Sequence, residues 1–345
     1  MQLISFRLGL FSGSAPASGD SVIAVGSVNN ILTPKIGYEG QFTVDNEDNI
    51  TFAYLPAVYT FPMEISGYPL YALGFNTSNP ADACSPLPSN TSDLSRKIVL
   101  IRRGWCDFVV KIEAVRPFGA EYIIFYNNED PIVAPTNFGG VLTGMVSAEQ
   151  GAQWISYLSE GKTIKFYFAD NPPDGVIYSA NTINGGAMST FSSWSPTYEL
   201  NIKPEVSAPG GNILSTYPID SGSYAISSGT SMAAPYISGI LALYMEAHGS
   251  NVTLNSSILS TTAKPLPFND GTQTYPYLAP VIQQGGGLVD AYAVVHYTTK
   301  ISPGVLQLND TAHFNEITSF TISNEGSTDV FYTFEHVRFP GLISR

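Results

Sequence analysis

The sequence predicts an α/β protein with a parallel sheet, and three stretches carry that prediction. Residues 21–28 form a β-branched apolar run, which is typical of a strand buried on both faces. Residues 98–126 have the pattern of a strand, an amphipathic helix and a second strand. An apolar run at helical spacing begins directly after Ser231.

The elements follow in order from the local patterns. Residues 31–62 are irregular and strand-like, and 98–101 and 122–126 are buried strands on either side of a helix over 108–118. Ser147 is placed to cap a helix that runs to about residue 159, and a strand follows at 163–168. We expect later helices at 256–263 and from Asp290 on. Alternating residues beyond 300 predict strands at 305–308, 320–324 and 330–334.

Ser231 is the residue that most directly suggests chemistry. It lies in Gly229–Pro235, where small residues lead straight into the apolar helix. A hydroxyl at a helix N-terminus is close to free N–H groups and to the positive end of the helix dipole, which suits a nucleophile. Pro235 fits the first turn of that helix. The alternative is that Thr230 or Ser231 is only an N-cap.

The segment Gly229–Pro235 resembles the serine motif of subtilisin-like serine proteases. The resemblance implies that Ser231 is the nucleophile position, that residues 11–18 line the pocket for the substrate residue before the scissile bond, and that 203–210 lead to the serine helix. The family's oxyanion asparagine is absent, because Arg7–Gly9 stand in its place. Asp220 matches the aspartate motif only superficially and is expected in a turn. None of the four histidines lies in the sequence motif that surrounds the family's catalytic histidine. They are His248, His296, His313 and His336.

A second resemblance covers roughly residues 48–170. The segments around Cys84, residues 97–104 and Tyr126 are similar to a protease-associated (PA) domain, which is commonly inserted in subtilisin-like proteases and implies partner binding or control of access. We therefore predict half of a subtilisin-like parallel-sheet domain (1–30 and 176–299), a PA insertion (45–172), and the first strands of a fibronectin-type-III-like β-sandwich (300–345). The chain is expected to be a fragment, truncated at both ends.

Composition favours a secreted protein without nucleic-acid or membrane partners. The formal charge is −13, and no apolar stretch is long enough to cross a membrane. Met1–Phe11 imitates a signal peptide, but Arg7 interrupts it. Cys84 and Cys106 can form one disulfide. Six N-glycosylation motifs support a eukaryotic secretory route: Asn49, Asn76, Asn90, Asn251, Asn255 and Asn309.

Two functions follow as hypotheses. The first is a secreted, fungal-type subtilisin-like endopeptidase that hydrolyses peptide bonds through Ser231, uses no cofactor or metal, and is inactive as this chain because the partners of the serine are missing. The alternative is a non-catalytic PA-domain protein that binds a protein or peptide. Half a parallel sheet would also leave an apolar edge along Val22–Val28, so we expect aggregation or a partner that covers it.

Overall fold

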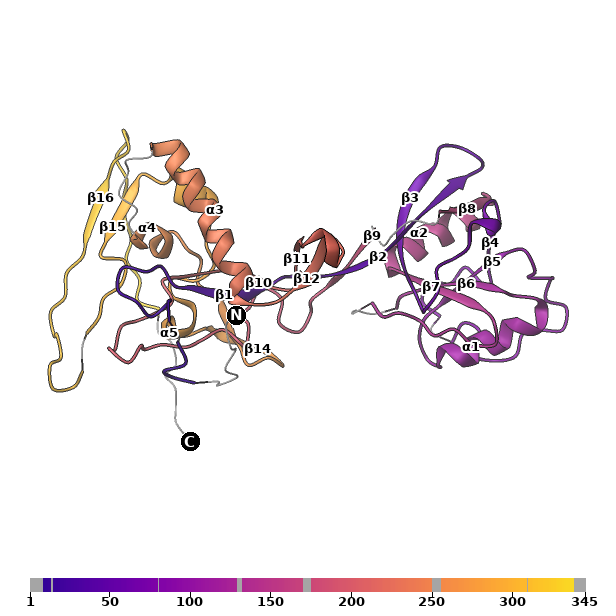
Figure 1. The fold of residues 1–345 in the computed structure, drawn as a ribbon, viewed down its shortest axis with the longest axis horizontal. Coiled ribbons are helices and arrows are strands. Elements are labelled where there is room, and N and C mark those ends of the chain that lie inside the picture. Colours follow the sequence, from indigo (N-terminus) through magenta and orange to yellow (C-terminus); the bar gives the residue numbers. More distant parts are fainter. Residues whose placement is uncertain are drawn as a thin grey trace. The chain divides into compact units, whose positions relative to one another are not determined.

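The computed structural model describes residues 9–13, 15–79, 81–128, 132–169, 175–249, 256–308 and 310–337. The chain divides into two compact units (Figure 1). Residues 1–31 and 182–345 form the serine unit, and residues 32–181 form the inserted unit. Each unit contains both helices and strands, which confirms a mixed α/β protein, and each has buried clusters of its own.

The inserted unit is built on one mixed sheet. Its strand order is β4-β5-β6-β7-β3-β2-β8, and β9 pairs with β2. Neighbours from β4 to β7 are parallel, and the other pairs are antiparallel. The strands are β2 (Leu32–Val44), β3 (Ile50–Pro56), β4 (Leu70–Ala72), β5 (Ile98–Arg102), β6 (Tyr122–Tyr126), β7 (Leu142–Val146), β8 (Ile164–Phe168) and β9 (Gly175–Ala180).

Two helices complete this unit and confirm the strand–helix–strand prediction. Helix α1 (Phe108–Val115) continues into a 3-10 turn (Arg116–Phe118) and connects the parallel strands β5 and β6. Helix α2 (Ala148–Ser159) starts as predicted, because the Ser147 hydroxyl accepts a hydrogen bond of 3.1 Å from the N–H of Gln150. A second 3-10 turn covers Met63–Ile65.

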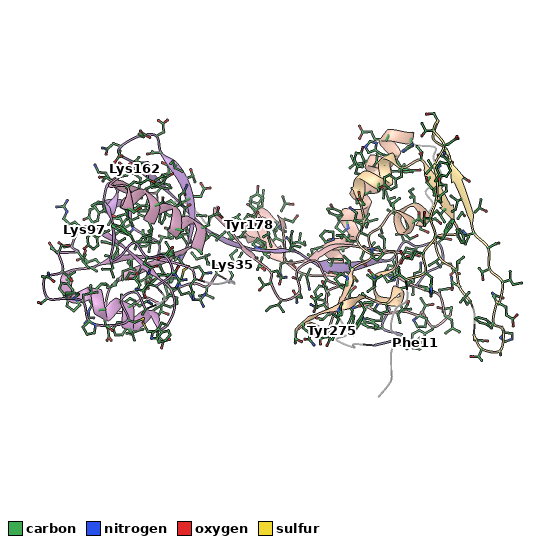
Figure 2. All side chains as sticks on the ribbon, turned by 180° about the vertical axis from the view of Figure 1, so that it is seen from behind. Phe11, Lys35, Lys97, Lys162, Tyr178 and Tyr275 are labelled. Atoms are coloured by element: carbon green, nitrogen blue, oxygen red, sulfur yellow. A yellow bond between two sulfur atoms is a disulfide. The ribbon has the colours of Figure 1, made fainter. Side chains whose placement is uncertain are left out.

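The core of the inserted unit lies in two clusters of buried side chains. In one, the fully buried ring of Trp154 meets Phe42, Phe52 and Phe166 edge-on, with ring centroids 5.5, 5.1 and 4.8 Å away. In the other, Ile112 of α1 packs with residues of the central strands. Each such side chain contributes roughly 1.5–3 kcal/mol of transfer free energy, so the unit has a substantial core of its own. Lys97 and Lys162, which are labelled in Figure 2, belong to this unit, and their ammonium groups lie over the rings of Tyr71 and Tyr157.

The inserted unit is longer at both ends than the predicted boundaries at 45 and 172. Residues 32–37 of β2 pair with residues 175–180 of β9, and the far half of β2 pairs with β3 and β8. The first strand of the unit, β2, therefore pairs with its last strand, β9. A local pattern gives no sign of this pairing, because the two segments are about 140 residues apart.

The serine unit is organised around one parallel strand pair and one long helix. Strand β1 (Val25–Asn29) pairs with β10 (Val206–Gly211), and helix α3 (Thr230–His248) packs on both. Shorter helices are α4 (Ser256–Thr261), α5 (Val281–Gln284) and α6 (Ala291–His296). Asp290 is the N-cap of α6 and not a residue of its first turn, so the helix begins one residue later than expected. The hairpins are β11 (Ile213–Thr216) with β12 (Tyr224–Ser227), β13 (Pro267–Asn269) with β14 (Thr274–Leu278), and β15 (Thr299–Ser302) with β16 (Thr321–Asn324).

The prediction of an open sheet edge along Val22–Val28 is wrong for the second half of that segment, toward Val28. On the side of β1 away from β10, the carbonyl of Ser27 accepts from the N–H of Ser189 at 2.8 Å, and the N–H of Asn29 donates to Ala187 at 2.9 Å. Val28 is 2% exposed, whereas Val22 is 37% exposed. The chain therefore covers this edge itself with residues 186–192, and no partner is needed there.

Two of the three C-terminal strands predicted from alternation are absent. Residues 320–324 contain β16, but 305–308 and 330–334 are irregular. The alternating side chains of the last segment remain in solvent, with Phe331 99% and Phe334 68% exposed. A period-two pattern becomes a strand only where a neighbouring strand takes up its hydrogen bonds, and β15 pairs with β16 instead.

Candidate active site

Helix α3 is fixed to the strand pair by its first two turns. Ala233 and Ile237 are buried against Val206 and Ala208 of β10, in one apolar cluster. The small side chain of Ala233 lets the start of the helix approach the sheet closely. The N-terminus of α3 is therefore positioned by the core, and the opposite face of its first turn stays open.

A close backbone approach sets where the helix begins. The N–H of Gly229 donates to the carbonyl of Gly210 at 2.7 Å. A Cβ on Gly210 would lie 2.4 Å from Ser27 Oγ and 2.7 Å from the Gly229 carbonyl, so only glycine fits there. Gly229 is the N-cap and Thr230 the first helical residue. The alternative in which Thr230 or Ser231 is the N-cap is thus wrong.

Ser231 occupies the second position of α3 and is exposed. Its side chain belongs to the first turn of the helix, where the positive end of the helix dipole stabilises negative charge. Pro235 lies inside the helix and not in its first turn, which corrects the expectation. Because Pro235 has no N–H, the carbonyl of Ser231 lacks the donor that a helix normally supplies four residues on.

A pocket of about 70 Å³ lies beside the start of α3. Thr230 borders it, and so do Gly13, Ala17 and Ser18 from the segment that was expected to line a substrate pocket. Residues 24–26 of the β1 segment and 192–197 complete the wall. Ser12 ties the two walls together, because its hydroxyl accepts from the N–H of Trp194 at 2.7 Å.

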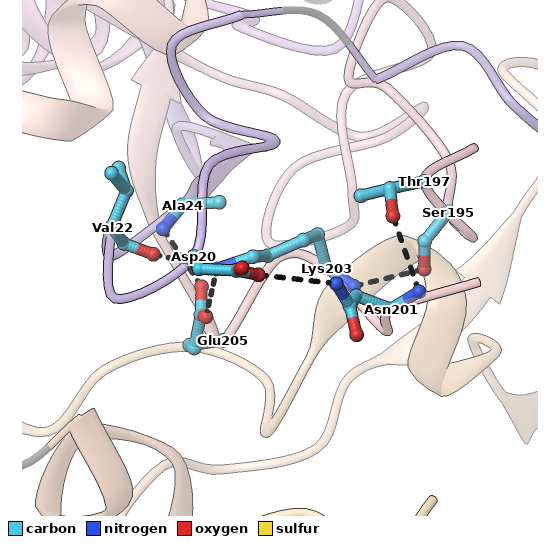
Figure 3. A network of polar contacts seen from close by, with 8 residues as sticks. All are labelled: Asp20, Val22, Ala24, Ser195, Thr197, Asn201, Lys203 and Glu205. Carbon is cyan, nitrogen blue, oxygen red and sulfur yellow. Dashed lines mark hydrogen bonds and ion pairs between the residues drawn. The ribbon is translucent and has the colours of Figure 1, made fainter. Parts of the chain in front are cut away.

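A partly buried ion pair connects the segment that leads into β1 with the segment before β10 (Figure 3). Lys203 Nζ is 2.5 Å from Glu205 Oε1 and donates to the carbonyl of Val22 at 2.6 Å. The other oxygen of Glu205 accepts from the N–H of Ala24 at 2.7 Å. The sequence did not single out this pair, because its partners are 181 residues away along the chain.

His248 and His296 are not placed to act as a base for Ser231. His248 ends α3, about 25 Å along the helix axis from Ser231 at 1.5 Å per residue, and its Nε2 lies 2.7 Å from the carbonyl of Val295. His296 ends α6 at that same distant end, and His313 pairs with Asp310 at 3.0 Å. Within the described ranges, no hydrogen bond links Ser231 to a histidine or carboxylate. Asp220 lies in an exposed 3-10 turn, as expected.

The remaining candidate residues fall into two groups. Cys84 and Cys106 form the predicted disulfide in the inserted unit, 22 residues apart. Three of the glycosylation motifs are exposed: Asn49, Asn76 and Asn90. The other three lie outside the described residues: Asn251, Asn255 and Asn309.

Over the part of the chain that the structure describes, no cluster of three metal-ligating side chains occurs, and no helix is both long and apolar enough to span a bilayer.

Ser231 is thus an exposed serine in the first turn of α3, and a pocket of about 70 Å³ that Thr230 borders lies beside that turn. The Subtilase family of S8 peptidases matches residues 9–278, and the chain belongs to that family. It is 32% identical over 213 residues to C5a peptidase of Streptococcus pyogenes, covering 58% of this chain and 17% of that protein. It is 31% identical over 255 residues to the minor extracellular protease Vpr of Bacillus subtilis, covering 71% of this chain and 30% of that protein.

The PII-type proteinase of Lactococcus lactis is 28% identical over 234 residues, which is 59% of this chain and 11% of that protein. The chain thus spans less than a third of the length of these relatives. Among solved structures, an aminopeptidase from Aneurinibacillus aligns with a TM-score of 0.28 and 21% identity, over 43% of this chain and 35% of that one. That alignment is too weak to inform the fold.

Proposed function

We propose that Ser231 is the nucleophile of a secreted serine endopeptidase. The observation that supports this is its placement: the hydroxyl is exposed at the second position of α3, beside a pocket that Thr230 borders. In such a site the serine oxygen attacks the peptide carbonyl, and N–H groups of the first helical turn stabilise the resulting oxyanion. A protein or peptide is therefore the substrate class.

We also propose that this 345-residue chain does not turn over peptides by itself. A serine needs a base within hydrogen-bond reach, and none of the described histidines meets that requirement at Ser231. In subtilisin, a member of the same family, losing the histidine alone costs about six orders of magnitude in kcat, and we carry that value over. Hydrolysis of fluorescently labelled casein should remain at background, and turnover abolished by Ser231→Ala would refute this proposal.

The environment of the nucleophile can be tested without a base. Both natural cysteines are in the disulfide, so a Ser231→Cys variant carries a single free thiol. The helix N-terminus should lower its pKa by about one unit, so at pH 7 iodoacetamide should alkylate it roughly threefold faster than a thiol in the helix middle, because the larger thiolate fraction outweighs the lower nucleophilicity. Ser238→Cys is the matched control, because Ser238 is exposed on the same helix. Equal rates would show that the helix start does not activate this position.

Secretion is proposed on the same basis. Vpr is named an extracellular protease, and three sequons of this chain lie on its surface. Expression through a eukaryotic secretory pathway should add glycans at Asn49, Asn76 and Asn90, and each Asn→Gln change should remove one glycan mass. Intact mass spectrometry that finds no glycan would contradict this route. The fungal type stays a prediction, since the relatives named above are bacterial.

The second proposal is that the inserted unit is a PA-type binding module. Its support is the self-contained core on both faces of its sheet. Residues 32–181 expressed alone should unfold cooperatively, whereas residues 45–172 should be less stable, because they lack all of β2 and all of β9. A molten product from 32–181 would refute an autonomous module. The β-sandwich beyond residue 300 also stays a proposal, for which β15 and β16 are the structural support.

A further inference from the structure

The pocket beside the start of α3 is small because of its volume and open because of its wall. Four of the residues that line it have the smallest side chains: Gly13, Ala17, Ala24 and Gly26. A protein cavity of about 150 Å³ holds benzene, and this pocket, at about 70 Å³, has roughly half that volume. It therefore has room for a side chain of about three heavy atoms and not for a phenyl ring.

The hydroxyl groups of the wall are already used to hold it together. Ser192 Oγ accepts from the N–H of Ser27 at 3.0 Å, and Ser195 Oγ accepts from the N–H of Lys203 at 3.0 Å. Thr197 Oγ1 accepts from a backbone N–H four residues further on at 3.1 Å. All three hydroxyls are buried, and Figure 3 shows two of them in this network. The wall is thus tied to neighbouring segments and does not need a charged ligand to satisfy it.

The charges near the pocket are balanced. Lys203 is the only charged residue among the described residues that line it. Its ammonium group is bound to Glu205 and to the carbonyl of Val22 (Figure 3). A substrate lysine or arginine would meet no carboxylate in the wall, and a substrate carboxylate would meet no uncompensated cation. Since burial of an unpaired charge is strongly unfavourable, the pocket favours an uncharged side chain.

Trp194 sets the upper limit on size, because it is the largest residue in the wall. Its N–H donates to Ser12 Oγ at 2.7 Å, and its carbonyl accepts from the N–H of Ser12 at 3.1 Å. These two bonds fix its backbone against the opposite wall of the pocket. Thr230 also borders the pocket, and it is the neighbour of Ser231. The substrate side chain nearest to the pocket is therefore that of the residue whose carbonyl is attacked.

We propose that this pocket selects a short, uncharged side chain, of the size of valine, on the substrate residue whose carbonyl Ser231 attacks. Trp194 and Gly13 are the residues that limit its size. This inference deepens the proposed endopeptidase function and rests on it.

The test uses the full chain carrying Ser231→Cys, which has a single free thiol. Three acetyl-Ala-Ala-X chloromethyl ketones are compared, in which X is valine, phenylalanine or lysine. The thiolate sulfur displaces chloride from the methylene carbon of the reagent, and intact mass gives the rate. Each rate is divided by that of the same reagent with Ser238→Cys, so that the intrinsic reactivity of the reagents cancels. The valine reagent should then be at least tenfold faster than the other two, because one methylene group alone changes discrimination by about 10- to 200-fold.

Two further changes in the Ser231→Cys chain test the residues that limit the size. A Cβ on Gly13 would meet no heavy atom within 4 Å, so Gly13→Leu has room to fill the pocket and should slow the valine reagent at least tenfold. Trp194→Ala should enlarge the pocket and accelerate the phenylalanine reagent at least tenfold. The lysine reagent should stay slow with Trp194→Ala, whereas unfolding would accelerate both. Tyr292→Ala removes an exposed aromatic ring that does not line the pocket, and it should leave the phenylalanine reagent slow.

Equal normalised rates for the three reagents would overturn the proposal. So would a phenylalanine reagent that Trp194→Ala does not accelerate, or a valine reagent that Gly13→Leu does not slow. Iodoacetamide carries no peptide, so its rates with Ser231→Cys and Ser238→Cys test the nucleophile position separately. Failure of the pocket is therefore distinguishable from failure of the proposed function.

Discussion

Lys111 gives the stability of the inserted unit a pH dependence of known sign. It is fully buried on α1, and its Nζ donates to the backbone carbonyl of Asp82. Burial lowers the pKa of Lys111 from 10.5 to about 8, although the Asp82 carboxylate opposes that shift. Below pH 8 the folded state therefore holds an ammonium group at a cost. Between pH 8 and 10.5 the folded lysine is neutral and the unfolded one is still protonated, so stability rises with pH.

The size of the effect follows from the two pKa values. One pKa unit corresponds to about 1.4 kcal/mol, so the lysine should contribute a gain of about 3 kcal/mol between pH 7.5 and 10.5. Lys111→Met fills a similar volume and cannot titrate. Urea unfolding followed by Trp154 emission, in a background where Trp105 and Trp194 are phenylalanine, gives the free energy of unfolding for both proteins. A difference between them that stays constant with pH would refute the reasoning.

Three further variants test single contacts by urea or thermal unfolding. Replacing Cys84 and Cys106 by serine should cost about 3 kcal/mol, because the disulfide closes a loop of 22 residues; an unchanged unfolding midpoint would contradict this. Lys203→Met should cost the serine unit about 1 kcal/mol, because it leaves the partly buried Glu205 carboxylate without its cation, whereas a variant of unchanged stability would show that the pair is dispensable. Gly210→Ala should cost about 2 kcal/mol through overpacking against the Gly229 carbonyl, and full stability would mean that this approach does not fix α3.

Elements with a strong local pattern could be predicted from the sequence. The strand–helix–strand segment has an apolar period that changes at its turns, and its strands β5 and β6 were found where expected. Ser147 was also predicted correctly as a cap, since capping depends on a residue three positions away. The start of α3 near Ser231 could be predicted for the same reason, because the signal for it lies in neighbouring residues.

Features that depend on distant partners could not be predicted. The cover over β1 comes from residues 186–192, and the boundary of the inserted unit depends on pairing between β2 and β9. The strand prediction at 330–334 failed because no neighbouring strand accepts its hydrogen bonds. At the site, Lys203 and Glu205 bond to Val22 and Ala24, and Gly210 lies against Gly229. These contacts join segments that are distant in the sequence, so no local pattern indicates them.

The central claim is that Ser231 occupies the nucleophile position of a subtilase, in a chain that supplies no base to it. Its most direct test is reaction of the purified 345-residue chain with a fluorophosphonate, followed by intact mass and peptide mapping. The account predicts no adduct at Ser231 above the level found at Ser238, an exposed serine of the same helix. Rapid, stoichiometric modification of Ser231 that Ser231→Ala abolishes would contradict it, because that reaction requires an activated serine.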